Sequence, residues 1–215
     1  CRDFRGEAGT WPGWDGPANV ACLYIGIFLD DAEMVNDAIA YYKTGKGGGC
    51  ITEGIVFGGQ PVEMGRDQPH AAIGIDAYAD LCQALWNQGL DMYAYEDNLL
   101  LKGFEYYARF NLEHPVDWTP IDYHGHKFYY PAPSNNAPSS MPNNRILANE
   151  AVYHHYVDRK GLDAPYLRAM MKLKNVEVLT GMMYTYSDTT TAYVSFPVPP
   201  IPEDVKAVSY THLTL

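Results

Sequence analysis

The chain has 215 residues, of which 47% are hydrophobic and 19% charged, a balance that excludes disordered, collagen-like and coiled-coil proteins. Fifteen lysines and arginines against 26 aspartates and glutamates give a net charge of -11. Nucleic acid is therefore not expected as a partner, because binding its phosphates needs a basic surface. The longest apolar run, residues 20–29, is far shorter than the roughly 18 residues of a membrane span, so no transmembrane helix is expected.

Two further features concern composition and the chain ends. Eighteen tyrosines against 7 phenylalanines are typical of a wet cleft that binds a polar ligand such as a sugar. The four cysteines, Cys1, Cys22, Cys50 and Cys82, are too widely spaced for a CxxC pair and are expected mainly in the core. Val208 to Leu215 resembles a translated sequencing adapter, so we expect residues 1–207 to be one partial domain of a longer protein.

The first half of the chain predicts three helices. Residues 19–30 and 32–42 carry apolar side chains at spacings of three and four, which indicates two antiparallel helices. Residues 50–65 contain four glycines and a proline and are expected to form a long irregular connection. Residues 68–87 predict a strong helix with Asp67 as its N-cap and His70 in its first turn.

The second half predicts further helices at residues 97–110, 144–159 and 165–174. Residues 111–142 form a loop rich in Pro, Asn and Tyr, of a length that is often functional. The stretch that follows, to residue 196, is ambiguous between helix and strand. Helices joined by long loops predict an all-α array of helical hairpins whose loops meet on one side.

The densest polar cluster precedes and opens the predicted helix 68–87. It supplies Glu63, Arg66, Gln68 and His70 to a helix N-terminus, where backbone N–H groups and the helix dipole favour an anion. Arg66 can bind a carboxylate through two hydrogen bonds, and Gln68 and His70 can donate further ones. A purely structural alternative has Asp67 as a cap and Arg66 paired with Glu63.

A second cluster lies on the predicted helix 144–159 and comprises Arg145, Asn149, Glu150, Tyr153, His154, His155 and Tyr156. Tyr153 and Tyr156 are three residues apart and hence adjacent on a helix. A tyrosine acts as a base only if nearby cations lower its pKa from about 10, and Arg145, His154 and His155 could do so. The same spacing is also common in packing, so it does not decide between the two.

A metal or cofactor is not expected. His124-Gly-His126 is a weak metal signal without a third nearby ligand. Motifs for phosphate loops, dinucleotides, zinc peptidases and serine hydrolases do not occur.

Several spaced motifs, in order along residues 19–165, resemble the alginate lyase superfamily of bacterial polysaccharide lyases. They are Gly59-Gln60 through Glu63, Arg66-Asp67-Gln68 with His70, Trp86 to Gly89, Gly103 to Tyr106, Asn111-Leu112, Tyr153 to Tyr156, Arg159 to Gly161 and Ala164-Pro165. The resemblance implies an incomplete (α/α) toroid, secreted or periplasmic, that cleaves a 1,4-linked uronic acid polymer by β-elimination. Alginate is the first expected polymer and glucuronan the second. The resemblance implies nothing about the oligomeric state.

The resemblance also implies roles for single residues. His70, with Arg66 and Gln68, would neutralise the sugar carboxylate so that the C5 proton becomes acidic enough to remove. Tyr156 matches the family's base, with Tyr153 as a second candidate, and Arg145 would assist. The sequence departs from the family pattern at His155 and at Pro69, where relatives have Asn.

The remaining expected substrate contacts are Glu63, Asn149, His154 and His155. The base and the neutralising groups act on adjacent atoms of one sugar ring, so His70 and Tyr156 are expected to face each other across a cleft. Two alternatives stay open: a glycoside hydrolase with carboxylates from Glu63, Asp67 or Glu150, and a sugar-binding protein without catalysis.

Overall fold

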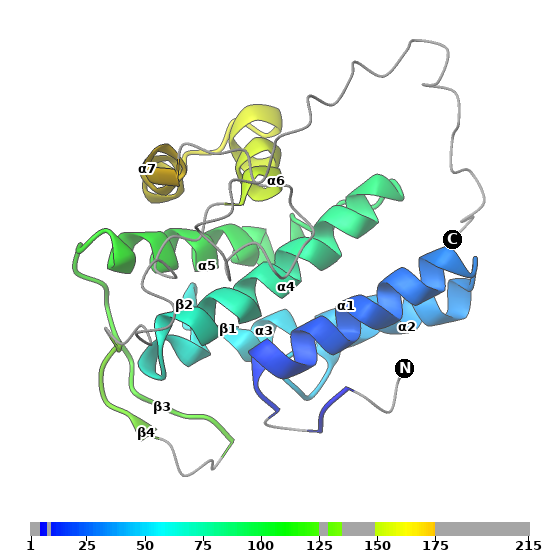
Figure 1. The fold of residues 1–215 in the computed structure, drawn as a ribbon, viewed down its shortest axis with the longest axis horizontal. Coiled ribbons are helices and arrows are strands. Elements are labelled where there is room, and N and C mark those ends of the chain that lie inside the picture. The colour runs from blue at the N-terminus through cyan, green and yellow to red at the C-terminus, as the bar shows by residue number, and fades with distance from the viewer. Residues whose placement is uncertain (1–4, 8–9, 125–128, 135–148, 175–215) are drawn as a thin grey trace.

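The computed structural model describes residues 5–7, 10–124, 129–134 and 149–174 (Figure 1). The fold is mostly helical, as predicted, with short strands in two places. In the described part of the chain, every helix is too short or too polar to cross a membrane.

The first two helices form the predicted antiparallel pair. Helix α1 (Pro12–Phe28) begins earlier than expected because Pro12 occupies a first-turn position, where its missing N–H is not needed. The chain turns at Asp30, whose φ of 54° places it in the left-handed region. Asp31 then caps α2 (Ala32–Thr44) by accepting a hydrogen bond from the Met34 N–H at 3.0 Å.

The expected irregular connection contains small regular elements. A single turn, α3 (Ile51–Gly54), leads into an antiparallel pair of strands, β1 (Ile55–Val56) and β2 (Gln60–Pro61). A 3-10 turn, η2 (Val62–Gly65), follows and delivers the chain to the start of α4. These elements position the first polar cluster.

Helix α4 (Gln68–Asn87) runs through the middle of the molecule, as Figure 1 shows, and the prediction of its extent is confirmed. Helix α1 packs closely along it. A Cβ atom on Gly74 would lie 2.8 Å from Cβ of Pro12, and one on Gly16 would lie 2.9 Å from Cβ of Ala77. Glycine at these two positions therefore permits the short distance between the helices.

Helix α5 (Tyr95–Asn111) lies on the other side of α4 from α1 (Figure 1). Residues 96–98 have φ values of 50–60°, so regular helical conformation begins at Leu99, two residues later than predicted. The predicted loop that follows contains a pair of antiparallel strands, β3 (Ile121–Asp122) and β4 (Tyr129–Tyr130).

The last described elements are short. Helix α6 (Glu150–Tyr153) runs directly into a π-helical segment, η3 (His154–Arg159), and α7 (Pro165–Lys174) packs against α5. The predicted helix 165–174 is confirmed. The first part of the predicted helix 144–159, including Arg145, lies outside the described residues, as do the ambiguous stretch to residue 196 and the adapter-like tail.

The main core gathers around α4. Its largest buried side chains include Leu23, Tyr42, Tyr78, Tyr93, Phe104, Tyr107 and Tyr156. Burial of a purely apolar side chain such as Leu23 or Phe104 contributes roughly 1.5–3 kcal/mol to stability. Cys50 and Cys82 are buried free thiols, and Cys22 is buried and disulfide-bonded.

Candidate functional site

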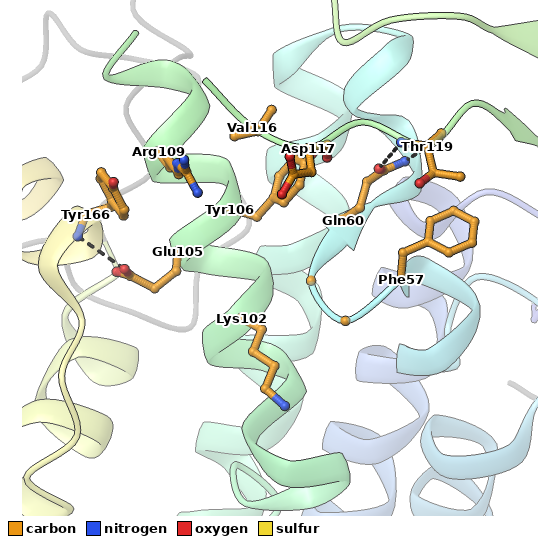
Figure 2. Close-up of a pocket in the computed structure, with 12 residues that line it drawn as sticks. Phe57, Gln60, Lys102, Glu105, Tyr106, Arg109, Val116, Asp117, Thr119 and Tyr166 are labelled. Carbon is orange, nitrogen blue, oxygen red and sulfur yellow. Dashed lines mark hydrogen bonds between the residues drawn. The ribbon is translucent and has the colours of Figure 1, made fainter. Parts of the chain in front are cut away.

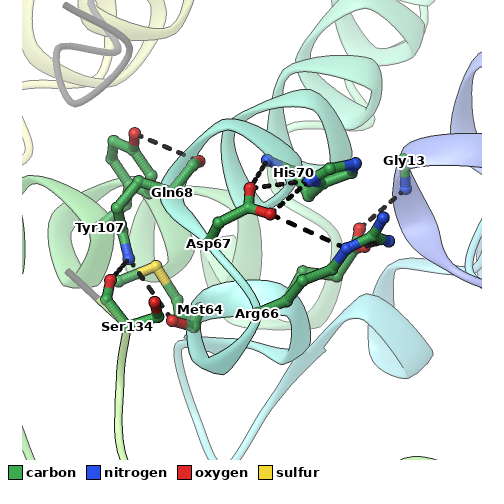
Figure 3. A network of polar contacts seen from close by, with 9 residues as sticks. Gly13, Met64, Arg66, Asp67, Gln68, His70, Tyr107 and Ser134 are labelled. Atoms are coloured by element: carbon green, nitrogen blue, oxygen red, sulfur yellow. Dashed lines mark hydrogen bonds and ion pairs between the residues drawn. The ribbon is translucent and has the colours of Figure 1, made fainter. Parts of the chain in front are cut away.

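The N-terminus of α4 holds a network of acids and bases (Figure 3). Asp67 adopts extended backbone and caps the helix by accepting a hydrogen bond from the His70 N–H at 2.9 Å. The same carboxylate lies 2.7 Å from Nδ1 of the His70 ring. One acid thus fixes both the start of the helix and the orientation of the imidazole.

The pKa of Asp67 lies below its usual value. Partial burial works to raise it, but hydrogen bonds from the ring and backbone of His70, together with the nearby charges of His70 and Arg66, outweigh burial. Asp67 is therefore ionised at neutral pH.

Glu63 holds Arg66, the second basic side chain of the network. Its side chain is 1% exposed, with Oε2 accepting a hydrogen bond from the Gly13 N–H at 3.0 Å and Oε1 accepting one from Nη1 of Arg66 at 3.1 Å. Burial raises the pKa of Glu63 to about 7, although Gly13, Arg66 and His70 each act to lower it. The contacts of the structural alternative, an Asp67 cap and an Arg66–Glu63 pair, are thus present.

Arg66 and His70 both contact the carboxylate of Asp67 (Figure 3). Each side chain is 32% exposed. Within the described residues, Nε2 of His70 has no hydrogen-bond partner, and Arg66 has more N–H groups than its contacts with Glu63 and Asp67 use. The two side chains are therefore anchored by acids yet able to bind an anion from solution.

Gln68 is placed differently from its neighbours. It is fully buried, its Nε2 donates to the carbonyls of Ser134 at 2.7 Å and Met64 at 3.4 Å, and its Oε1 accepts from Nδ2 of Asn111 at 2.8 Å. Both amide hydrogens are engaged within the protein. Gln68 links α4 to α5 and to the segment around Ser134. Its side chain has no free N–H group for the predicted contact with substrate.

The second cluster begins with a cap. Asn149 is buried, and its Oδ1 accepts a hydrogen bond from the Val152 N–H at 3.1 Å, which starts α6. Its Nδ2 donates to Oδ1 of Asp76 on α4 at 2.7 Å. Asp76 lies six residues beyond His70, or about 9 Å along the helix axis. Asn149 therefore fixes α6 beside the first half of α4.

Tyr156 is wholly buried, and the prediction that it faces His70 is wrong. Its hydroxyl donates to the backbone carbonyl of Tyr93 at 2.7 Å, and the two rings meet edge to face at 5.5 Å. Burial is the main cause that raises the pKa of Tyr156 far above its usual value, and Cys82 adds to it. Cys82 lies twelve residues after His70 on α4, about 18 Å along the axis. Tyr156 in this position is a packing residue.

His155 is also a core residue. Its ring stacks on Tyr93 at 4.1 Å and meets the edge of Trp86 at 4.7 Å, and Nε2 lies 3.3 Å from Oδ1 of Asp91. Burial is the main cause that lowers the pKa of His155, with Lys160 adding to the effect and Asp91 opposing it. The predicted substrate contact through His155 is not supported, since the side chain is 1% exposed.

Tyr153 and His154 lie closer to the surface. Tyr153 is half-buried and packs against the main core, with its ring 5.7 Å from that of His154. The His154 side chain is 51% exposed and pairs with Asp158. Of the two candidate tyrosines, only Tyr153 therefore has a surface that a ligand could reach. Arg145, the predicted assisting cation, lies outside the described residues.

Other predicted features are separate from both clusters. His124 bonds Oε2 of Glu53 through Nε2 at 2.7 Å, and His126 lies outside the described residues. Within the described part of the chain, no three His, Cys, Asp or Glu side chains are grouped to hold a metal ion.

The sequence analysis missed a pocket beside α5. Lys102, Glu105, Tyr106 and Arg109 line it at spacings of three and four. Such a polar stripe on one helical face is a signal that could have been found.

Comparison of the chain with models of protein families, with curated proteins and with solved structures gives no match in any of the three. The resemblance to alginate lyases therefore stays a prediction.

Proposed function

We propose that this chain belongs to a polysaccharide lyase that cleaves a 1,4-linked uronic acid polymer by β-elimination, with alginate before glucuronan as substrate. The observation that carries the proposal is the pair Arg66 and His70. Both are positioned by buried or half-buried acids, and both are one-third exposed.

The chemistry of β-elimination explains what such a pair would do. Removal of the C5 proton leaves negative charge that spreads onto the neighbouring carboxylate of the sugar. Cationic hydrogen-bond donors stabilise that charge when they are already in position before the reaction. The His70 ring can donate a hydrogen bond from Nε2, while Arg66 offers two parallel N–H groups.

The base in this proposal is Tyr153 rather than Tyr156. A Tyr153 phenolate would take the C5 proton, the C5–H electrons would form the C4–C5 double bond, and the C4–O bond would break. The resulting phenol could then return a proton to the leaving oxygen. The half-buried position of Tyr153, on the short helix that Asn149 ties to α4, supports this assignment.

The finer fold, an incomplete (α/α) toroid, is part of the same proposal. In a toroid each helix packs against helices of neighbouring hairpins. Helix α1 carries large apolar side chains that are exposed here, namely Trp14, Tyr24, Ile25 and Phe28. A neighbouring hairpin would cover such a face, which supports the toroid arrangement.

A glycoside hydrolase is a weaker proposal on this geometry. Both oxygens of Glu63 accept hydrogen bonds from the protein, and the Asp67 carboxylate is bound to His70. Neither of these two acids is free to protonate a glycosidic oxygen or to attack a sugar carbon, which leaves one of the three candidates, Glu150, where hydrolysis needs two carboxylates.

The test is the ultraviolet absorbance of the conjugated double bond that β-elimination creates, measured on a panel of uronic acid polymers with the full-length gene product. We expect absorbance to rise with alginate or glucuronan. His70→Ala and Tyr153→Phe should each reduce turnover at least about a hundredfold, since each removes a group that acts in the transition state. His124→Ala, an exposed histidine of the β3 segment, is the matched control and should retain turnover. Normal turnover in His70→Ala would refute the assignment.

A further inference from the structure

A pocket of about 380 Å³ lies beside α5 (Figure 2), and no residue predicted from the sequence as a site residue lines it. Its walls include Phe57, Gln60, Lys102, Tyr106, Arg109 and Tyr166. The volume is at the lower end of the roughly 300–1,000 Å³ of small-molecule sites, which suits a ligand the size of one sugar ring.

One wall of the pocket is the polar face of α5. Lys102, Tyr106 and Arg109 follow one another at spacings of four and three, so their side chains emerge on the same side of the helix. The β1–β2 turn forms the facing wall and approaches α5 closely. A Cβ atom on Gly59, whose φ is 154°, would lie 3.2 Å from the carbonyl oxygen of Lys102.

Hydrogen bonds fix the remaining walls. Nε2 of Gln60 donates to the Thr119 carbonyl at 2.8 Å, and the Thr119 N–H donates back to Oε1 of Gln60 at 2.9 Å. The Tyr106 hydroxyl donates to the backbone carbonyl of Asp117 at 2.7 Å. The pocket is therefore formed before a ligand arrives, which lowers the entropy lost on binding.

Two acids line the pocket, Glu105 and Asp117, and the one on the α5 face, Glu105, is bound within the protein. Glu105 accepts hydrogen bonds from the backbone N–H groups of Tyr166 at 3.2 Å and Leu167 at 2.7 Å, at the start of α7. Figure 2 shows the first of these contacts across the pocket edge. Glu105 thus holds α7 in place instead of neutralising a cation in the pocket.

Arg109 is left without an acid. Its Nε is buried and has no hydrogen-bond partner, and no carboxylate among the described residues forms an ion pair with it. Its guanidinium lies 5.7 Å from the ring centre of Tyr166. A buried donor without a partner is unfavourable, and a ligand oxygen at this position would satisfy it.

We propose that this pocket binds a single uronate unit of an acidic oligosaccharide, with the sugar carboxylate on Arg109 and the sugar ring against Tyr166 and Tyr106. A carboxylate matches the planar fork of the guanidinium, and an apolar sugar face suits an aromatic ring beside it. The choice of a uronate among carboxylates rests on the proposed function. The pocket would bind a sugar unit of the polymer other than those joined by the bond that is cleaved.

The test is a titration of the nitrogen-labelled chain followed by NMR of the arginine Nε–H groups. His70→Ala is the background, so that cleavage does not consume the ligand. The Arg109 signal is identified by its loss in Arg109→Gln. We expect a uronate trisaccharide to shift this signal saturably, while a neutral glucose trisaccharide and acetate at equal concentration do not. No shift with the uronate, or an equal shift with acetate, would overturn the proposal.

Variants provide the second readout. Arg109→Gln should weaken binding of the uronate trisaccharide about tenfold or more, since the charge-assisted hydrogen bonds to the carboxylate are lost. If Arg109→Gln does not fold, Arg109→Lys replaces it, because lysine keeps the charge and most of the packing. The same weakening of binding is expected, since lysine lacks the two parallel N–H groups of the guanidinium. Unchanged affinity in a folded variant would contradict the proposal.

The outcomes for the two proposals are separable. If the full-length protein shows lyase turnover but the Arg109 signal does not respond, only the pocket proposal fails. If the signal responds but no polymer yields a conjugated product, the pocket stands as a uronate site and the lyase proposal fails.

Discussion

Replacing Glu63 by Gln should remove a pH dependence from the stability of the protein. Burial raises the pKa of this carboxyl from an ordinary value of 4.5 to about 7. The folded state therefore holds the proton more tightly than the unfolded state does. The associated stabilisation is complete below about pH 4.5 and is lost as the pH rises through about 7. At 1.36 kcal/mol per pKa unit, the loss amounts to about 3 kcal/mol.

The assay is urea unfolding of the wild type and Glu63→Gln across the window from about pH 4.5 to 8. Glutamine does not titrate, so the free energy of unfolding of the variant should fall about 3 kcal/mol less than that of the wild type over this window. Only the change with pH is compared, because the substitution also alters the hydrogen bonds with Gly13 and Arg66. Glu113→Gln, at an exposed position after α5, is the matched control and should follow the wild type. Parallel curves for wild type and Glu63→Gln would refute the reasoning.

Three further predictions concern the two clusters. Tyr156→Phe should destabilise the fold by about 1–3 kcal/mol, because the buried Tyr93 carbonyl loses its hydrogen-bond partner, yet the variant should retain most of the turnover per folded molecule. Thermal unfolding and the lyase assay measure the two effects. Abolished turnover in a folded variant would restore Tyr156 as the base. Gln68→Leu should lower the free energy of unfolding by about 2–4 kcal/mol, since Asn111 and the Ser134 carbonyl both lose hydrogen-bond partners. The control Gln88→Leu, at the end of α4, should change it by less than about 1 kcal/mol. Similar values for both variants in urea unfolding would contradict the stabilising role of the Gln68 hydrogen bonds. Treatment with a metal chelator should leave lyase turnover intact, because the proposed neutralising groups are protein side chains, and complete loss restored by one ion would contradict this.

The sequence is sufficient to predict α4 and its start. Asp67 and Pro69 are strong start signals, and apolar residues recur at helical spacing for the next five turns. The start of α5 is different. Glu96, Asp97 and Asn98 adopt left-handed backbone without a glycine to announce it, so the predicted helix began too early.

The roles of the two tyrosines could not be predicted from spacing. A prediction from helical periodicity assumes 3.6 residues per turn, but the chain changes to a π-helical segment at His154. The wider turn is visible in the hydrogen bond from the Lys160 N–H to the His155 carbonyl at 3.1 Å. Tyr156 nevertheless lies four residues after the buried Val152 and seven after the buried Asn149, so it shares the face that packs into the core, and its spacing from Tyr153 alone does not reveal this.

The sequence predicts that the residues of the first cluster lie together, but not which of their side chains are buried and which are exposed. Spacing brings Glu63, Arg66, Gln68 and His70 to one helix end, and the structure places them there. Which of them is buried depends on what packs against the helix end. Asn111 of α5 and the Ser134 segment cover Gln68, and both are distant from it in the sequence.

The most direct test of the proposed β-elimination is to cleave alginate and glucuronan and to measure the masses of the products by mass spectrometry. Elimination consumes no water, so the account predicts that one of the two new chain ends is unsaturated and that its fragment is lighter by one water molecule than the saturated oligosaccharide of the same length. Saturated fragments alone, with one water molecule gained per cleaved bond, would show hydrolysis and would contradict the account.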